Sequence, residues 1–241
     1  MKKVFLLTIL IGPIITFASN VAYYSHPNNE IIVISEYLSI FKNEDSNAKE
    51  LRKVKLLDKL YSLGKEIINN RVFIESKDGI KGWVEVNKTN LLTKEWKSAE
   101  NFQNMVIFYP EHMGFLFREG GRWEKQEALM YGGLILDQKL YNDKYFILSH
   151  HIISNYNDFI KSMKAHKSHE YNKRIELKYI DFNNLKSYYQ EGVSREGKKF
   201  FRLIIDGGEK TYSLSVQLQN RNYNEEDELY AKKILFSVRL R

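Results

Sequence analysis

Short apolar runs separated by polar turns occupy the chain from residue 31 to residue 92. The runs lie at residues 31–34, 37–41, 51–63, 67–74 and 82–86. Runs of this length that are rich in β-branched and aromatic residues are typical of β-strands. This region therefore predicts a small all-β barrel.

One turn in this region carries a clear hairpin signal. Asp78-Gly79 stands between the apolar runs at residues 72–75 and 82–86. The Asp-Gly dipeptide tolerates the positive φ angles that a tight hairpin turn requires. We expect these two runs to pair as antiparallel neighbours.

Strand and helix patterns alternate over residues 100–241. Apolar residues recur at helical spacing after Asn155, and a second helix is expected from Asn224 to Val238, with acidic residues in its first turn. Strand patterns lie at residues 105–109, 115–118, 175–182, 200–206 and 211–219. We expect an α+β domain in which an antiparallel sheet carries two helices.

Three smaller features add detail to this prediction. The charged residues 93–99 predict a linker or a short helix at the domain boundary. Gly132-Gly133 predicts a hairpin turn or a bulge. In residues 211–219, large apolar side chains alternate with polar ones such as Ser213 and Ser215, which predicts one dry and one wet face.

The segment Asp78-Gly79-Ile80-Lys81-Gly82-Trp83-Val84 resembles the Asp-Gly-x-x-Gly-Trp-Val block of bacterial SH3-like domains. Weaker parts of that pattern are matched by Leu38-Ser39-Ile40, Val54-Lys55-Leu56-Leu57 and Leu91-Leu92. The family's Gly-Pro in the first loop is replaced here by residues 43–46. Its Trp at the start of the next-to-last strand is replaced around Arg71. The resemblance covers residues 31–92 and implies an SH3-like barrel.

The resemblance also implies a module that binds a peptide or peptidoglycan, or that packs against an attached domain. Phe41 and Trp83 are the candidate ligand-binding residues, because such aromatic rings offer flat apolar surface. The alternative for both side chains is packing in the barrel core. The element order of residues 100–241 resembles that of PsbP-like domains, exported or lumenal α+β modules, which favours a binding or scaffolding role over catalysis.

The first 18 residues have the three parts of a secretory signal peptide. Lys2 and Lys3 precede an apolar run at residues 4–17, and Ala18 supplies a small residue for cleavage. The alternative is a retained membrane anchor, but a spanning helix needs roughly 20 apolar residues. We expect a periplasmic or secreted protein with no membrane span after cleavage.

The charge distribution and the absence of cysteine exclude one class of partner and several kinds of chemistry. The net charge of +7 comes from 37 Lys and Arg against 30 Asp and Glu, spread along the whole chain. A nucleic-acid footprint would be a concentrated basic stripe with aromatic residues between, so we expect no nucleic-acid partner. The absence of Cys excludes disulfides, thiolate nucleophiles and a lipid anchor on Cys.

Recognisable catalytic motifs are absent from the sequence, including Gly-x-Ser-x-Gly, a Gly-rich phosphate loop and His-Glu-x-x-His. We therefore expect no cofactor and assign no catalytic residue. A group of histidines and one glutamate could form an exposed metal site with nitrogen and oxygen ligands. Histidines at this spacing also occur by chance, and we expect no metal there. This group is His150, His151, His166, His169 and Glu170.

These observations predict a non-enzymatic cell-envelope protein that binds a peptide, peptidoglycan or a partner protein. The alternative is a peptidoglycan-active glycosidase that uses carboxylates within residues 100–241. Such an enzyme needs only two carboxyl groups at a suitable separation, which a sequence does not reveal.

Overall fold

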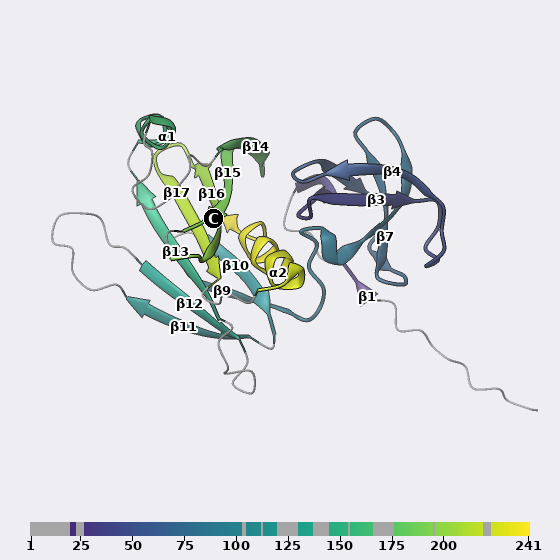
Figure 1. Cartoon of the computed structure of the whole chain (residues 1–241), viewed down its shortest axis with the longest axis horizontal. Helices are drawn as coiled ribbons and strands as arrows, with labels where there is room; N and C mark the ends of the chain where they lie inside the picture. The colour runs from purple at the N-terminus through teal and green to yellow at the C-terminus, as the bar shows by residue number, and fades with distance from the viewer. Residues whose placement is uncertain are drawn as a thin grey trace, which may run out of the picture.

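The computed structural model describes residues 20–22, 27–102, 105–111, 113–119, 130–136, 145–153, 155–165, 176–194, 196–218 and 223–241. The predicted signal peptide at residues 1–18 lies outside them. The described residues form mostly antiparallel β-sheet with two α-helices (Figure 1). This confirms the predicted β-rich architecture at the level of its elements.

The N-terminal part contains a six-stranded sheet with the order β2-β5-β7-β8-β3-β4. Within residues 27–102 its edge strands β2 and β4 are not paired with each other, so the sheet is open and does not form the closed barrel that the sequence predicted. Two short strands, β1 (Asn20–Val21) and β6 (Glu66–Ile67), pair beside it. The strands of the six-stranded sheet are β2 (Glu30–Ile32), β3 (Tyr37–Phe41), β4 (Glu50–Lys55), β5 (Lys59–Ser62), β7 (Arg71–Ser76) and β8 (Lys81–Glu85).

The predicted hairpin is confirmed as β7 and β8. Its register pairs Phe73 with Trp83 and Ile74 with Gly82. Gly79 has a φ of 82° in the turn, as the Asp-Gly signal required. Alternation along β7 and β8 places Val72, Ile74 and Val84 in the core and Phe73 and Trp83 on the opposite face.

The C-terminal part contains a seven-stranded antiparallel sheet with the order β11-β12-β13-β17-β16-β15-β14. The predicted hairpin over residues 200–219 is confirmed as β16 and β17. The strands are β11 (Met113–Glu119), β12 (Met130–Leu136), β13 (Tyr145–Ile153), β14 (Lys178–Phe182), β15 (Leu185–Val193), β16 (Lys199–Asp206) and β17 (Thr211–Leu218).

Two details of this sheet contradict the sequence-based prediction. Ser213 and Ser215 are 3% and 7% exposed, so the face predicted to be wet is buried. β17 lies between β13 and β16, and Ile204, the neighbour of Ser213 on β16, is buried as well, so this face is covered on both strands. Gly132-Gly133 lies inside β12, in unbroken register with both neighbouring strands, and not in a turn or bulge.

Both predicted helices are present. α1 (Tyr156–Ala165) begins after Asn155, whose side-chain oxygen accepts a hydrogen bond from the backbone of Asp158 at 3.2 Å. α2 (Glu225–Leu235) begins with a capping box between Asn224 and Asp227. It ends earlier than predicted, since the Ser237 hydroxyl donates to the Ile234 carbonyl and the chain turns into a strand. Neither described helix is long and apolar enough to span a membrane.

The predicted linker at residues 93–99 is wrong in its second half. Residues from Trp96 onward form β9 (Trp96–Phe102), which belongs to a three-stranded sheet with β10 (Met105–Pro110) and β18 (Arg239–Leu240). The Trp96 ring stacks on Tyr230 of α2, with ring centroids 6.4 Å apart. The charged side chains here are exposed, but the backbone pairs with β10 as a strand and Trp96 packs on α2.

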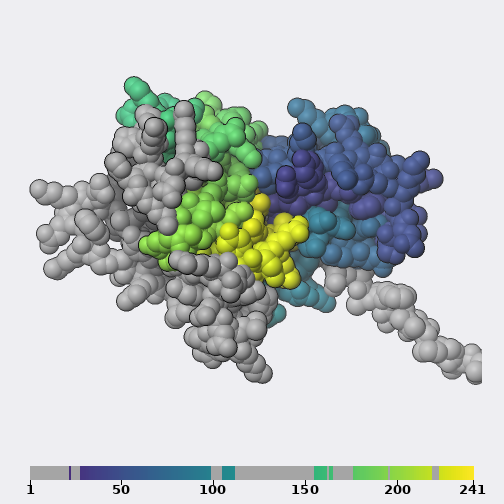
Figure 2. Space-filling view, in the orientation of Figure 1, coloured from purple at the N-terminus to yellow at the C-terminus, as the bar shows by residue number. Residues whose placement is uncertain are grey.

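Two hydrophobic cores meet at residues 31–34, all of which are buried. Ile31 and Val33 belong to the core of the six-stranded sheet, whereas Ile32 and Ile34 belong to the core that includes α2 and the seven-stranded sheet. α2 therefore lies between the two sheets (Figure 1), and the two parts form a continuous surface around it (Figure 2).

The close approach of β8 to β3 makes a first prediction at Gly82. A Cβ atom there would lie 2.5 Å from Ile40 Cγ2 and 2.6 Å from the Phe41 carbonyl oxygen. We expect Gly82→Ala to reduce the free energy of unfolding by about 1–3 kcal/mol, as overpacking does. Urea denaturation measures the change. Gly64→Ala is the matched control, since a Cβ there meets nothing within 4 Å; equal effects of the two variants would contradict the prediction.

Candidate functional site

Three aromatic side chains form a row across neighbouring strands of the six-stranded sheet: Phe73 on β7, Trp83 on β8 and Phe41 on β3. The register pairs Phe73 with Trp83 and Trp83 with Phe41. The Phe73 and Trp83 ring centroids are 5.4 Å apart. We call these three residues the aromatic row. The structure thus brings together Phe41 and Trp83, the two candidate ligand-binding residues of the sequence.

The aromatic row is partly exposed and lies outside both hydrophobic cores. The side chains of Val72 and Val84, which point to the other face of the same strands, are fully buried. Leu63, 46% exposed, follows β5 and donates its backbone N–H to the Phe73 carbonyl, which extends the apolar surface by one strand. The row is therefore an outer surface of the sheet.

Arg71 closes one end of this surface. Its guanidinium carbon lies 3.9 Å from the centroid of the Phe41 ring, within the range of a cation–π contact. The guanidinium also donates hydrogen bonds to the backbone carbonyls of Asn43 and Asp45, and the side chain is 6% exposed. Arg71 therefore fixes the Phe41 ring and the loop of residues 43–46.

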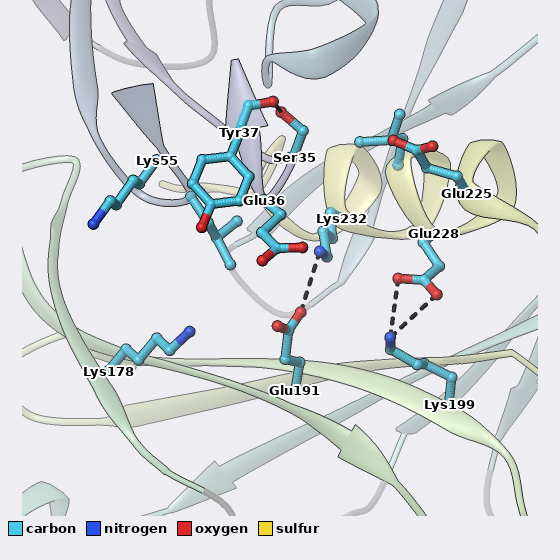
Figure 3. Close-up of a pocket in the computed structure, with 12 residues that line it drawn as sticks. Ser35, Glu36, Tyr37, Lys55, Lys178, Glu191, Lys199, Glu225, Glu228 and Lys232 are labelled. Atoms are coloured by element: carbon cyan, nitrogen blue, oxygen red, sulfur yellow. Dashed lines mark hydrogen bonds and ion pairs between the residues drawn. The ribbon is translucent and has the colours of Figure 1, made fainter. Parts of the chain in front are cut away.

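A charged cleft with a volume of about 550 Å³ lies between the six-stranded sheet and α2 (Figure 3). Lys55 and Lys178 lie at one end of it, and Lys199 and Glu228 lie at the other. The remaining charged groups come from the turn before β3, from β15 and from α2: Glu36, Glu191, Glu225 and Lys232.

Two lysine–carboxylate pairs line this cleft. Lys232 Nζ lies 3.1 Å from Glu191 Oε2, and Lys199 Nζ lies 3.0 Å from Glu228 Oε2. The Tyr189 hydroxyl also donates to Glu191, at 2.7 Å. Burial opposes the charge of Glu191, but Lys232 and the hydroxyl of Tyr189 outweigh it and hold the Glu191 pKa below its usual value.

These pairs bear on the glycosidase alternative. The general acid of a glycosidase is a carboxyl group whose pKa is raised, so that it carries a proton at working pH. The pKa of Glu191 is shifted in the opposite direction. Glu228 is held in an ion pair with Lys199. The cleft carries carboxylates that are suited to ion pairing.

The side chains of the histidine group lie outside the part of the chain that the structure describes. The backbone of His150 and His151 lies in β13, and their side chains lie outside the description. His166, His169 and Glu170 lie outside the described residues as well. Among the residues described, no cluster of three or more His, Asp or Glu side chains could hold a metal ion.

The sequence did not reveal every part of these surfaces. The sequence could have revealed the position of Phe73, because the Asp-Gly turn fixes the register that places Phe73 opposite Trp83. The role of Arg71 could not be predicted in this way, since its contact with Phe41 spans 30 residues of sequence. The cleft joins β3, β15 and α2, and no local pattern relates such distant segments.

Comparison with known proteins gives no further guidance on these surfaces. No protein-family model matches the chain, and no curated protein matches it. The residues of the structure therefore carry the functional argument.

The Glu191–Lys232 pair makes a second prediction. We expect Lys232→Met to reduce the free energy of unfolding at pH 7 by about 1–3 kcal/mol, because it leaves a largely buried carboxylate without its cation. Lys178→Met, at an exposed position of the same cleft, should change stability by less than about 0.5 kcal/mol. Chemical denaturation compares the two variants. Equal losses of stability would show that the Glu191–Lys232 ion pair makes no special contribution.

The same pair also predicts a dependence on pH. A carboxylate whose pKa is lowered by folding stabilises the protein above its unfolded pKa of about 4.3, and this stabilisation is lost as pH falls through the folded value. Glu191→Gln should therefore weaken the loss of stability on acidification below about pH 5. Denaturation curves at several pH values measure this, and an unchanged pH profile would show that Glu191 does not contribute to it.

Proposed function

We propose that this chain is a non-enzymatic, exported cell-envelope protein whose six-stranded sheet serves as an SH3-like module and binds peptidoglycan through the aromatic row. The observation that carries the proposal is the alignment of Phe41, Phe73 and Trp83 on an outer face of the sheet. The signal-peptide pattern and the Asp-Gly-x-x-Gly-Trp-Val block support the location and the module.

The chemistry of the aromatic row suits a glycan with attached peptides. Aromatic rings on neighbouring strands present a flat apolar strip, on which the C–H faces of sugars and apolar peptide side chains can rest. Strands lie about 4.8 Å apart, so three of them span roughly 10 Å, the length of about two sugar rings. Glu75 and Lys81, paired at 4.0 Å on the same face, supply polar groups beside the strip.

Two properties of the row favour binding over a purely structural role. Arg71 holds the Phe41 ring in place, so little side-chain entropy remains to be lost on binding. The rings lie outside both cores, so folding leaves their apolar surface partly exposed. Both properties are typical of preorganised contact surfaces.

A fourth prediction tests this proposal on purified sacculi. We expect the mature protein to be retained on sacculi without release of muropeptides, and Trp83→Ala to weaken retention about tenfold, the effect of losing roughly 1.4 kcal/mol of contact energy. Tyr179→Ala is the matched control, since Tyr179 is 60% exposed on β14 of the other sheet. Co-sedimentation measures the bound fraction, and circular dichroism shows that each variant is folded.

The outcomes separate the two functional classes. Release of soluble muropeptides by the wild type would support the glycosidase and overturn the non-enzymatic role. Retention that Trp83→Ala and Tyr179→Ala reduce equally would show that the aromatic row is not the contact surface. Absence of retention would overturn peptidoglycan as the ligand.

A further inference from the structure

A second cavity adjoins α2, with a volume of about 690 Å³. Its walls come from the turn after β8, from the segment before and at the start of β9, and from α2. This volume lies within the range of roughly 300–1,000 Å³ that small-molecule sites occupy. The residues that matter here are Val86, Glu95, Trp96, Glu226, Tyr230 and Lys233.

Lys233 is the unusual member of this wall. Its side chain belongs to a residue only 6% exposed, and its Nζ donates a hydrogen bond to the Val86 carbonyl at 3.1 Å. Nζ also lies 5.9 Å from the centroid of the Trp96 ring. The described residues place no carboxylate in an ion pair with it. Its neighbour Lys232, by contrast, is paired with Glu191.

The surroundings of Lys233 favour the neutral amine over the charged ammonium. Burial lowers the pKa of Lys233 to about 7, because a charged ammonium is poorly solvated there. A neutral amine keeps its N–H donation to Val86 and has a lone pair left over. A lone pair on an amine at the wall of a cavity is a nucleophile, as in lysines that form Schiff bases.

The aromatic walls define what the cavity accepts. Trp96 and Tyr230 are stacked at an interplanar angle of 27°, and Tyr230 stands one helical turn before Lys233 on α2. A planar, uncharged molecule fits such walls. We propose that this cavity is a covalent site in which Lys233 condenses with a small aldehyde to form an imine. The site is separate from the aromatic row and does not depend on the proposed function.

The condensation balances without any further reagent. The Lys233 nitrogen attacks the carbonyl carbon, a C–N bond forms, and the carbonyl oxygen becomes a hydroxyl after taking a proton from the amine through solvent. The hydroxyl then leaves as water, with a proton from solvent, while the nitrogen lone pair forms the C=N bond. In its protonated form the imine retains one N–H, which can donate to the Val86 carbonyl as the amine does.

The charges around the cavity are compatible with this chemistry. Glu225 and Glu226 on α2, Glu95 on the turn before β9 and Lys88 on the turn after β8 line it together with Lys233. Burial, with Glu226 and Glu95, raises the pKa of Tyr230, so this phenol stays neutral across the physiological range. Among the described residues, none of these carboxylates forms an ion pair with Lys233, so burial determines the protonation of its amine.

A labelling experiment on the mature chain provides the fifth prediction. The protein is incubated with benzaldehyde and cyanoborohydride, which reduces an imine to a stable secondary amine, and labelled peptides are mapped by mass spectrometry. At pH 7 the neutral fraction of Lys233 exceeds that of an ordinary lysine by roughly a thousandfold. We expect at least a tenfold excess of label at Lys233 over any exposed lysine.

Controls separate reactivity from loss of the fold. Lys233→Met should abolish the dominant label, and Lys94→Met, at an exposed position next to the cavity wall, should leave it unchanged. The wild type alone also tests the site, because its labelling should reach half its maximum near pH 7. Label spread evenly over exposed lysines, or a half-maximum above about pH 9, where ordinary lysines begin to deprotonate, would overturn the proposal.

Discussion

The structure depends on residues 31–34, a segment that is apolar on both of its faces. Ile31 and Val33 point into one core, and Ile32 and Ile34 point into the other. The segment's backbone is equally engaged: the N–H of Ile32 donates to the Asn90 side chain at 2.7 Å, and the N–H of Ile34 donates to the Lys88 carbonyl at 3.0 Å. Because this segment is buried on both faces, separating the two sheets would expose its apolar side chains to water.

Docking of the two sheets around this segment determines where α2 must lie, and α2 in turn determines the chemistry of the junction. Lys232 and Lys233 are consecutive and both 6% exposed, yet they reach different surroundings. Lys232 meets Glu191 in the charged cleft, whereas Lys233 meets a backbone carbonyl and an indole ring. A buried cation is stabilised by a counter-ion, and a buried lysine without one is stabilised by giving up its proton. Two neighbouring lysines of α2 are thus stabilised in different ways, one by an ion pair and the other by loss of its proton.

The sequence predicted what local chemistry decides. The Asp-Gly turn gave the register of β7 and β8, and the Asn224 cap gave the start of α2, because both signals act within a few residues. It did not predict that Ser213 and Ser215 are buried or that Trp96 begins a strand. Those outcomes depend on partners far along the chain: β13 and β16 flank β17, and Tyr230 stacks on Trp96. The same limit hid Lys233, whose sequence neighbours look like an ordinary charged helix face.

The arrangement also explains why the aromatic row can serve as a separate surface. The six-stranded sheet meets the rest of the chain through β2, through Leu56 and Leu57 in the turn after β4, through the Lys59–Asp181 ion pair and through the residues that follow β8. The outer faces of β7, β8 and β3 are not part of these contacts. Arg71 joins the row to the first loop through Phe41, and neither residue contributes to the core that contains α2. Sites without shared partners act nearly additively. Occupancy of the row should therefore leave the reactivity of Lys233 unchanged, because no described contact of the row reaches the cavity beside α2.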